Sequence, residues 1–245
     1  MLEFSLMTKT KIILASGSIG RKQLLEKLGV PFQVIPSSID EEKITDTNPF
    51  VMLQKRSRAK AQNVLSSLSK RYTLNVYPER SRRAKRYLII AADSMAILGN
   101  KAYGKPKNKK HAKDFLSDLM GKTHIFATAT YIILLKHPSV NNPSQPPLNL
   151  RGGVNIPPLR LRGGEGELET YRWENLTKTK VTLRKLSSSE LSFYTSHYDL
   201  TRFAAGYALN ETPWDLVTKI EGSYTNVIGL PFEILLPILS SFKII

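Results

Sequence analysis

The stretch ILASGSIGRKQLLEKLGV, Ile13–Val30, decides the fold because a strand pattern passes through a short turn into a helix pattern. The apolar run predicts a strand over Ile12–Ala15, and the spaced leucines predict a helix over Arg21–Leu28. The turn presents free backbone N–H groups at a helix N-terminus, where the helix dipole favours an anion. Arg21 and Lys22 are unfavourable there unless an anion compensates them. The turn is therefore either a phosphate cradle or an ordinary connection with exposed basic residues.

Strand and helix patterns alternate along the rest of the chain. Further strands are predicted over 32–35, 88–92 and 125–135, and further helices over 50–68, 109–120 and 188–194. Helix starts are expected at Asn48-Pro49, Asn108 and Ser187. The C-terminal PFEILLPILSSF segment predicts a helix with a kink or a stop at Pro237. This alternation is typical of an α/β fold, and we expect one domain over residues 1–245.

Two segments depart from these patterns. Residues 71–87 are strongly basic and are interpreted as a short insertion. Residues 137–175 are rich in Pro, Gly and Arg, and they contain the near-repeat PPLNLRGG and PPLRLRGG. Two copies are too few for a solenoid. We therefore predict a disordered insertion that interrupts a hairpin with strands over 131–135 and 179–184.

The formal net charge of +16 raises the question of nucleic-acid binding. About half of the excess lies in residues 71–87 and 136–180, two stretches that look unlike a folded core, which favours a solvated surface over a nucleic-acid interface. An Arg-bearing arm for nucleic acid or a protein partner is the alternative. The chain has no cysteine, which excludes disulfides and thiolate chemistry. It also lacks a long apolar run and a secretory signal pattern, so we expect a cytoplasmic protein without a membrane span.

Two further segments carry candidate site residues. GNKAYGKP resembles a phosphate-binding P-loop, but Pro106 stands where Ser or Thr must bind Mg²⁺, so a P-loop ATPase is rejected and Lys105 remains a phosphate contact. In LIIAADSMAIL, Asp93 ends a buried strand pattern. It could hold a divalent cation or accept a proton from water, or it could only cap the next turn.

The remaining patterns exclude other chemistries. The four histidines lack metal-ligand spacing, and His124 is interpreted as a hydrogen-bonded structural residue. A G-x-S-x-G motif is absent from the sequence, so a serine hydrolase triad has no support.

In their order and local spacing these segments resemble the Maf family of nucleotide pyrophosphatases over about 180 residues. The family shows an A-S-x-S-P-R-R loop, a helix and an acidic pair where this chain has ILASGSIGRKQLLEKLGVPFQVIPSSIDEE. The other matching segments are RAKAQNV, AADSMAIL, GKPKNKKHAKDFLSDLMGKTHIFATAT, RFAAGYALNE and IEGSYTNVIGLPFEILLPIL.

The resemblance implies a Maf/ITPase-like domain, a twisted mixed β-sheet flanked by helices with two lobes around a cleft. It implies hydrolysis of a nucleoside triphosphate to the monophosphate and diphosphate with a divalent metal, Mg²⁺ or Mn²⁺, and a role in removing non-canonical nucleotides. Asp93 matches the catalytic carboxylate, and Glu41 and Asp93 would hold the metal. The substrate-binding positions would be Ser16, Gly20, Arg21, Lys60, Ser94, Lys105 and Asn210. Since family members often form dimers, the resemblance also raises the question of whether this chain forms a homodimer.

The chain departs from the family at the cradle, where S-P-R-R is replaced by Ser18-Ile19-Gly20-Arg21. Members that prefer dTTP and UTP typically carry Arg, Thr and Gln where this chain has Gly20, Ser94 and Asn210. The missing arginine removes a charge-assisted contact worth about 1.5–3 kcal/mol. A dTTP/UTP preference is therefore not carried over. The alternatives are a weakened nucleotide-binding regulator of cell division and a nucleic-acid binder that uses the Arg-rich segments.

Overall fold

The fold is built on one mixed β-sheet. The computed structural model describes residues 10–73, 86–136, 169–209, 211 and 214–245. Within these ranges the seven strands are β1 (Thr10–Leu14), β2 (Phe32–Val34), β3 (Arg86–Leu98), β4 (Lys101–Tyr103), β5 (Thr123–Lys136), β6 (Glu169–Leu183) and β7 (Val217–Glu221). The sheet order is β2-β1-β3-β5-β6-β7, with β4 paired to β3. Strands β2, β1 and β3 run parallel, and the other pairs are antiparallel.

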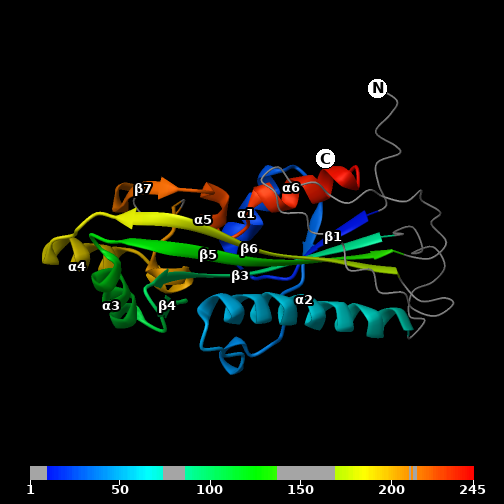
Figure 1. Cartoon of the computed structure of the whole chain (residues 1–245), viewed down its shortest axis with the longest axis horizontal. Coiled ribbons are helices and arrows are strands. Elements are labelled where there is room, and N and C mark those ends of the chain that lie inside the picture. The colour runs from blue at the N-terminus through cyan, green and yellow to red at the C-terminus, as the bar shows by residue number, and fades with distance from the viewer. Residues whose placement is uncertain (1–9, 74–85, 137–168, 210, 212–213) are drawn as a thin grey trace.

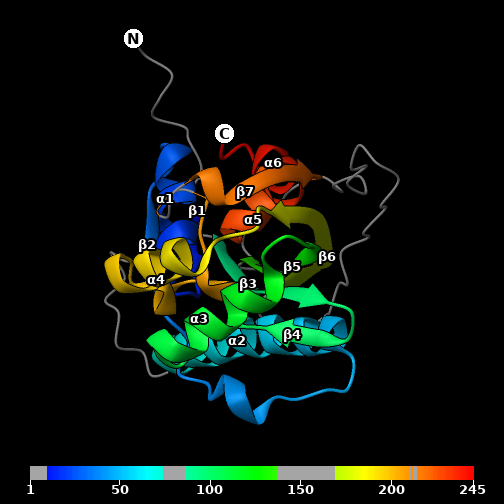
Figure 2. The same cartoon turned by 90° about the vertical axis from the view of Figure 1, so that its left-hand side faces the viewer.

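Helices flank this sheet on both faces. They are α1 (Ile19–Lys27), α2 (Pro49–Thr73), α3 (Lys109–Leu119), α4 (Ser188–His197), α5 (Tyr224–Ile228) and α6 (Phe232–Ser241), with short 3₁₀ turns at η2 (Glu41–Lys43), η4 (Leu200–Arg202), η5 (Ala204–Gly206) and η6 (Trp214–Leu216). Figures 1 and 2 show α2 on one face and α1 with α6 on the other. The mixed sheet with helices around it confirms the predicted fold class.

Three predicted helix starts are capped by their own side chains. Asn48 Oδ1 accepts the Phe50 N–H, and Asn108 Oδ1 accepts the His111 N–H. Ser187 forms a capping box with Glu190, which satisfies N–H groups that a helix start otherwise leaves unpaired.

Strand β1 is buried on both faces, and its alternate side chains point to opposite sides of the sheet. Ile12 and Leu14 lie in the core that includes residues of α1 and α6. Ile13 and Ala15 lie in the core on the α2 side. This explains why the chain reads as a continuous apolar run before the Ser16 bend.

A second core region lies toward the other end of the long strands. Phe115 and Leu116 of α3 pack there with Phe126 of β5 and Val181 of β6. Strands β3, β5 and β6 pass through both core regions, and Figure 1 shows them running along the longest axis of the molecule. Within the described ranges, no helix combines the length and the hydropathy that a bilayer crossing needs.

Several predicted boundaries are wrong. Disorder was predicted over 137–175, but β6 begins at Glu169 and pairs with β5 from Glu169 to Thr182. At the predicted insertion 71–87, α2 continues to Thr73 and β3 begins at Arg86. Residues 74–85 and 137–168 lie outside the described residues, so the insertions predicted there stay predictions. Helix α6 does not stop at Pro237, because five residues precede this proline in the helix and four follow it.

His124 is buried and forms a hydrogen-bonded pair with Tyr207, as its structural interpretation predicted. Its side chain is 2% exposed, and Nε2 lies 2.7 Å from the Tyr207 hydroxyl. Burial lowers the pKa of His124 to about 4, because the charged imidazolium would lose its hydration. Burial likewise raises the pKa of Tyr207. The pair is therefore neutral at physiological pH.

We expect His124 to make the protein acid-labile. Its pKa in the folded state lies below the ordinary 6.5, so the unfolded chain takes up the proton first and stability is lost as pH falls from 6.5 toward 4. Between pH 7.5 and pH 5 this group should cost about 2 kcal/mol of unfolding free energy. Urea unfolding at the two pH values measures the free energy of unfolding. Its loss between pH 7.5 and pH 5 should be about 2 kcal/mol smaller in His124→Gln than in the wild type. The exposed His197→Gln is the matched control, and an unchanged pH dependence in His124→Gln would contradict the assignment.

Candidate active site

Most of the predicted site residues within the described ranges meet where the strand order reverses around β1. The Ser16 bend follows β1, and the parallel pairing of β1 with β3 ends at Leu14 and Ile90. The Ala15 N–H then donates to the Ile90 carbonyl at 2.8 Å. Asp93 follows three residues later on β3, beyond the carboxyl end of β1. Open α/β sheets bind ligands at such a switch point.

Arg21 ties three separate segments together beneath the bend. Its side chain is buried, and Nη1 donates to Ser16 Oγ at 2.8 Å while Nη2 donates to Ser94 Oγ at 2.9 Å. Nε donates to the Gly229 carbonyl at 2.8 Å. Burial lowers the pKa of Arg21, and the Asp93 carboxylate opposes this shift. Arginine nevertheless stays charged, so the network places a fixed cation under the cradle.

Gly229 makes this contact possible. It has a φ of 112°, in the left-handed region that favours glycine, and it caps the C-terminus of α5. A Cβ there would lie 3.3 Å from both Arg21 Nε and Ser94 Oγ. The sequence interpretation missed this packing contact between Gly229 and Arg21.

Asp93 is the buried acid of the site. It is 6% exposed, and Oδ1 accepts a hydrogen bond from Lys60 Nζ of α2 at 2.7 Å. The same Nζ lies 2.8 Å from Oε2 of Glu41, whose side chain is 43% exposed. Asp93 Oδ2 is buried and has no hydrogen-bond partner within the described part of the chain. One carboxylate oxygen is thus left free for a ligand or a water molecule.

The loop that carries Glu41 is fastened to α2 on both sides. Asn63 Oδ1 accepts the Ser38 N–H at 3.0 Å, and Arg56 Nε donates to the Ile44 carbonyl at 3.0 Å. These contacts flank Lys60 on the same helix and do not involve it. They position Glu41 independently of its ion pair with Lys60.

Lys105 adds a further cation to the same field. The residue as a whole is exposed, yet protein atoms around its ammonium group displace hydrating water and so lower the pKa of Lys105. Repulsion from the Arg21 guanidinium lowers this pKa further. Its loop is held by the Gly104 carbonyl, which accepts the Ala205 N–H at 2.8 Å. In the described part of the site, three cations therefore surround two carboxylates, a balance that suits a polyphosphate.

The donor set fits a divalent cation only in company with phosphate oxygens. No group of three or more His, Cys, Asp and Glu side chains suited to a metal occurs within the described residues. Mg²⁺, however, is usually held by one or two carboxylates together with substrate phosphates. The carboxylates of Glu41 and Asp93 would provide that number of protein ligands.

Two other predicted positions stand apart from these contacts. A Cβ added at Gly20 would lie 3.1 Å from both Cγ2 and the carbonyl oxygen of Ile228. This glycine therefore allows α1 and α5 to approach closely, which the comparison with the family loop did not reveal. Asn210 lies outside the described residues.

The sequence interpretation also missed a buried polar chain behind Ser94. Thr128 Oγ1 lies 2.9 Å from Ser94 Oγ and donates to the Asn226 carbonyl at 3.0 Å. The Asn226 amide donates to the Phe126 carbonyl and to Thr179 Oγ1. The only sequence signal is a set of polar residues within apolar strands, which does not identify their partners.

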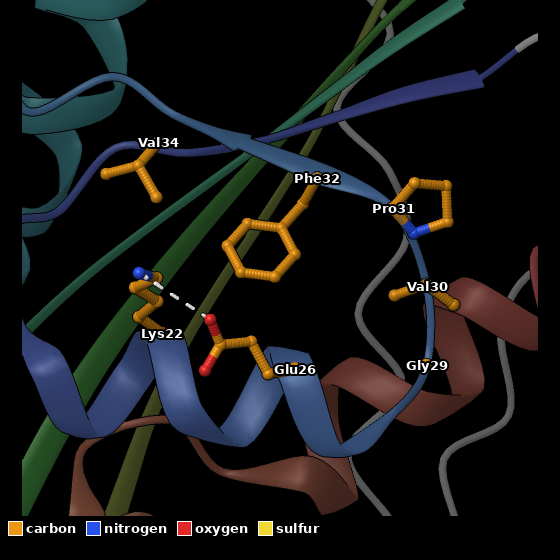
Figure 3. A pocket seen from close by; sticks show the side chains of 7 residues that line it. All are labelled: Lys22, Glu26, Gly29, Val30, Pro31, Phe32 and Val34. Carbon is orange, nitrogen blue, oxygen red and sulfur yellow. Dashed lines mark ion pairs between the residues drawn. The ribbon is translucent and has the colours of Figure 1, made fainter.

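A shallow groove between α1 and β2 lies apart from this constellation. Figure 3 shows Lys22 and Glu26 paired at its α1 side, facing Phe32 and Val34 of β2. It contains none of the predicted site residues, so the cradle at Ser16 and Asp93 is the candidate active site.

Arg21→Met should destabilise the protein by about 2–5 kcal/mol, because it removes the three hydrogen bonds that Arg21 donates to buried acceptors on separate segments. Urea unfolding with and without the substitution measures this cost. Lys22→Met is the matched control, since Lys22 forms only an exposed helical pair with Glu26 and should contribute less than about 0.5 kcal/mol. Similar costs for the two variants would show that Arg21 does not hold the cradle together.

Comparison with known proteins assigns the family. A family model described as Maf-like protein matches residues 11–242. The dTTP/UTP pyrophosphatase of Treponema denticola is 30% identical, over 94% of this chain and 96% of the relative. That of Agathobacter rectalis is 31% identical over 91% and 92%, and that of Syntrophus aciditrophicus is 29% identical over 93% and 87%. Because the family match spans nearly the whole chain and includes the cradle and Asp93, this protein belongs to the Maf family.

Proposed function

We propose that this chain is a nucleoside triphosphate pyrophosphatase that cleaves a (d)NTP to the (d)NMP and diphosphate. The observation that carries the proposal is a buried Asp93 with one free carboxylate oxygen beside a cationic cradle. Its membership of the Maf family and its relatives named dTTP/UTP pyrophosphatases support the same activity.

The cradle would hold the triphosphate by charge and by backbone donors. Lys60 and Lys105 supply ammonium groups, and Arg21 retains N–H groups beyond the three that its buried contacts use. The bend at Ser16 leads into α1, whose N-terminal N–H groups favour a phosphate. Phosphoryl transfer depends mainly on such positioning and charge stabilisation.

The free Oδ2 of Asp93 would orient a water molecule toward the α-phosphorus and accept its proton. A bond forms between the water oxygen and the α-phosphorus. The bond from that phosphorus to the oxygen bridging the α- and β-phosphates breaks, and diphosphate leaves with the electron pair. We propose that Glu41 and Asp93 hold a divalent cation, Mg²⁺ or Mn²⁺, which when bound would neutralise charge on the phosphates.

For the base, we propose that dTTP and UTP are accepted with a weaker preference than in relatives that carry the family arginine. Gly20 supplies no cation, and its crowding against Ile228 leaves little room for a longer side chain. Ser94 is engaged by Arg21 and Thr128, which limits its freedom to contact a base. Such a site would also admit non-canonical nucleotides.

Asp93→Asn should lower diphosphate release by at least about 100-fold, because an amide cannot accept the proton from water. The assay follows diphosphate from several nucleotides with Mg²⁺ or Mn²⁺. Asp114→Asn, an exposed position on α3, is the control for loss of an acidic charge. Equal activity of Asp93→Asn and the wild type would refute the assigned chemistry.

The preference for dTTP and UTP over other nucleotides should be about 10- to 100-fold smaller than in a dTTP/UTP pyrophosphatase that carries the family arginine, the range that one charge-assisted contact supplies. The two enzymes are compared by kcat/KM for dTTP, UTP, dCTP, dATP and non-canonical nucleotides in one buffer. Discrimination as strong as that of the relative would show that Gly20 does not weaken base selection.

A further inference from the structure

Lys60 already occupies the position between the two acidic side chains. Its ammonium lies 2.7 Å from Asp93 Oδ1 and 2.8 Å from Glu41 Oε2, and its side chain is 6% exposed. A buried ammonium held by two carboxylates is a satisfied ion pair, and it neutralises much of the field that would attract a second cation.

A divalent cation and this ammonium compete for the same oxygens. Mg²⁺ binds carboxylate oxygens at about 2.0–2.1 Å, so bridging Glu41 and Asp93 requires the two groups to close on a space that Lys60 Nζ fills. Arg21 and Lys105 add further repulsion, since each lies within the field of both carboxylates. A polyphosphate would cancel this excess of positive charge and offer Lys60 new acceptors.

We infer that Lys60 acts as a resident counter-cation that excludes divalent metal from the free protein, so that metal and polyphosphate bind together. This inference rests on the proposed function for the identity of the polyphosphate. On binding, the Lys60 ammonium transfers its hydrogen bonds from the carboxylates to phosphate oxygens.

The surroundings allow the inference to be tested by removing Lys60 alone. Glu41 keeps its position through the contacts of Asn63 and Arg56 with its loop. Asp93 is held by the register of β3 with β5, where it lies opposite Ala129. A variant without the ammonium therefore leaves the two carboxylates in place, with Asp93 Oδ2 still free.

The experiment measures protein-bound Mn²⁺ by the enhancement of water-proton relaxation, which separates it from Mn²⁺ held by free triphosphate. Without triphosphate, Lys60→Met should bind Mn²⁺ at least 10-fold more tightly than the wild type, and Lys60→Arg should resemble the wild type because it keeps the charge. Adding inorganic triphosphate should tighten Mn²⁺ binding to the wild type at least 10-fold. Without triphosphate, the double variant Lys60→Met with Asp93→Asn should lose the gain in Mn²⁺ affinity that Lys60→Met alone shows. That loss would locate the metal at Asp93.

Equal or weaker Mn²⁺ binding by Lys60→Met would overturn the inference. If that variant does not fold, as judged by circular dichroism, the wild type decides the matter, because equal Mn²⁺ binding with and without triphosphate also overturns it. The binding measurement requires no turnover. A protein with the expected Mn²⁺ pattern that releases no diphosphate would contradict only the proposed function, whereas an active enzyme whose Lys60→Met variant gains no affinity would contradict only this inference.

Discussion

The buried guanidinium of Arg21 is the interaction on which the rest of the site depends. Its three donors reach the bend after β1, the middle of β3 and the end of α5, segments that lie far apart in the sequence. A cation buried in this way is costly unless it is hydrogen-bonded and near negative charge. The chain meets that condition with three acceptors and with the fields of Asp93 and Glu41. The arginine therefore links two properties of the site. Its hydrogen bonds hold the three segments together, and its charge contributes to the positive field of the cradle.

Local patterns were sufficient to predict the elements that carry the site. Strand β1 and helix α1 follow from the apolar run and the leucine spacing on either side of Ser16, because both faces of this strand are buried. The caps at Asn108 and Ser187 could be read directly, since a cap needs only residues within one helical turn. Asp93 was found by the same logic, as a polar residue at the end of an apolar run.

What the sequence could not supply are contacts between distant segments. The Gly229 carbonyl lies 208 positions from Arg21, and no periodicity links them. The role of Gly20 depends on how closely Ile228 approaches, which is a property of tertiary packing. Strand β6 was predicted too short because its first residues adjoin a Pro- and Gly-rich segment, although Trp173 packs against Phe242 of the C-terminal region. Tertiary contacts here override the composition of the neighbouring chain.

The two acidic residues of the site sit on supports of different rigidity. Asp93 belongs to the long central strand β3, whose pairing with β5 fixes its backbone. Glu41 lies on a short 3₁₀ turn, is only partly buried, and is connected to the rest of the molecule chiefly through the loop contacts with α2. In the proposed mechanism, small shifts on the Glu41 side would accommodate a substrate that displaces the Lys60 ammonium, while the Asp93 carboxylate would stay fixed. Rigid elements hold a reactive group more accurately than loops do. The proposed reaction would therefore rely on the fixed position of Asp93 in β3, and the movement needed for binding would fall on the loop that carries Glu41.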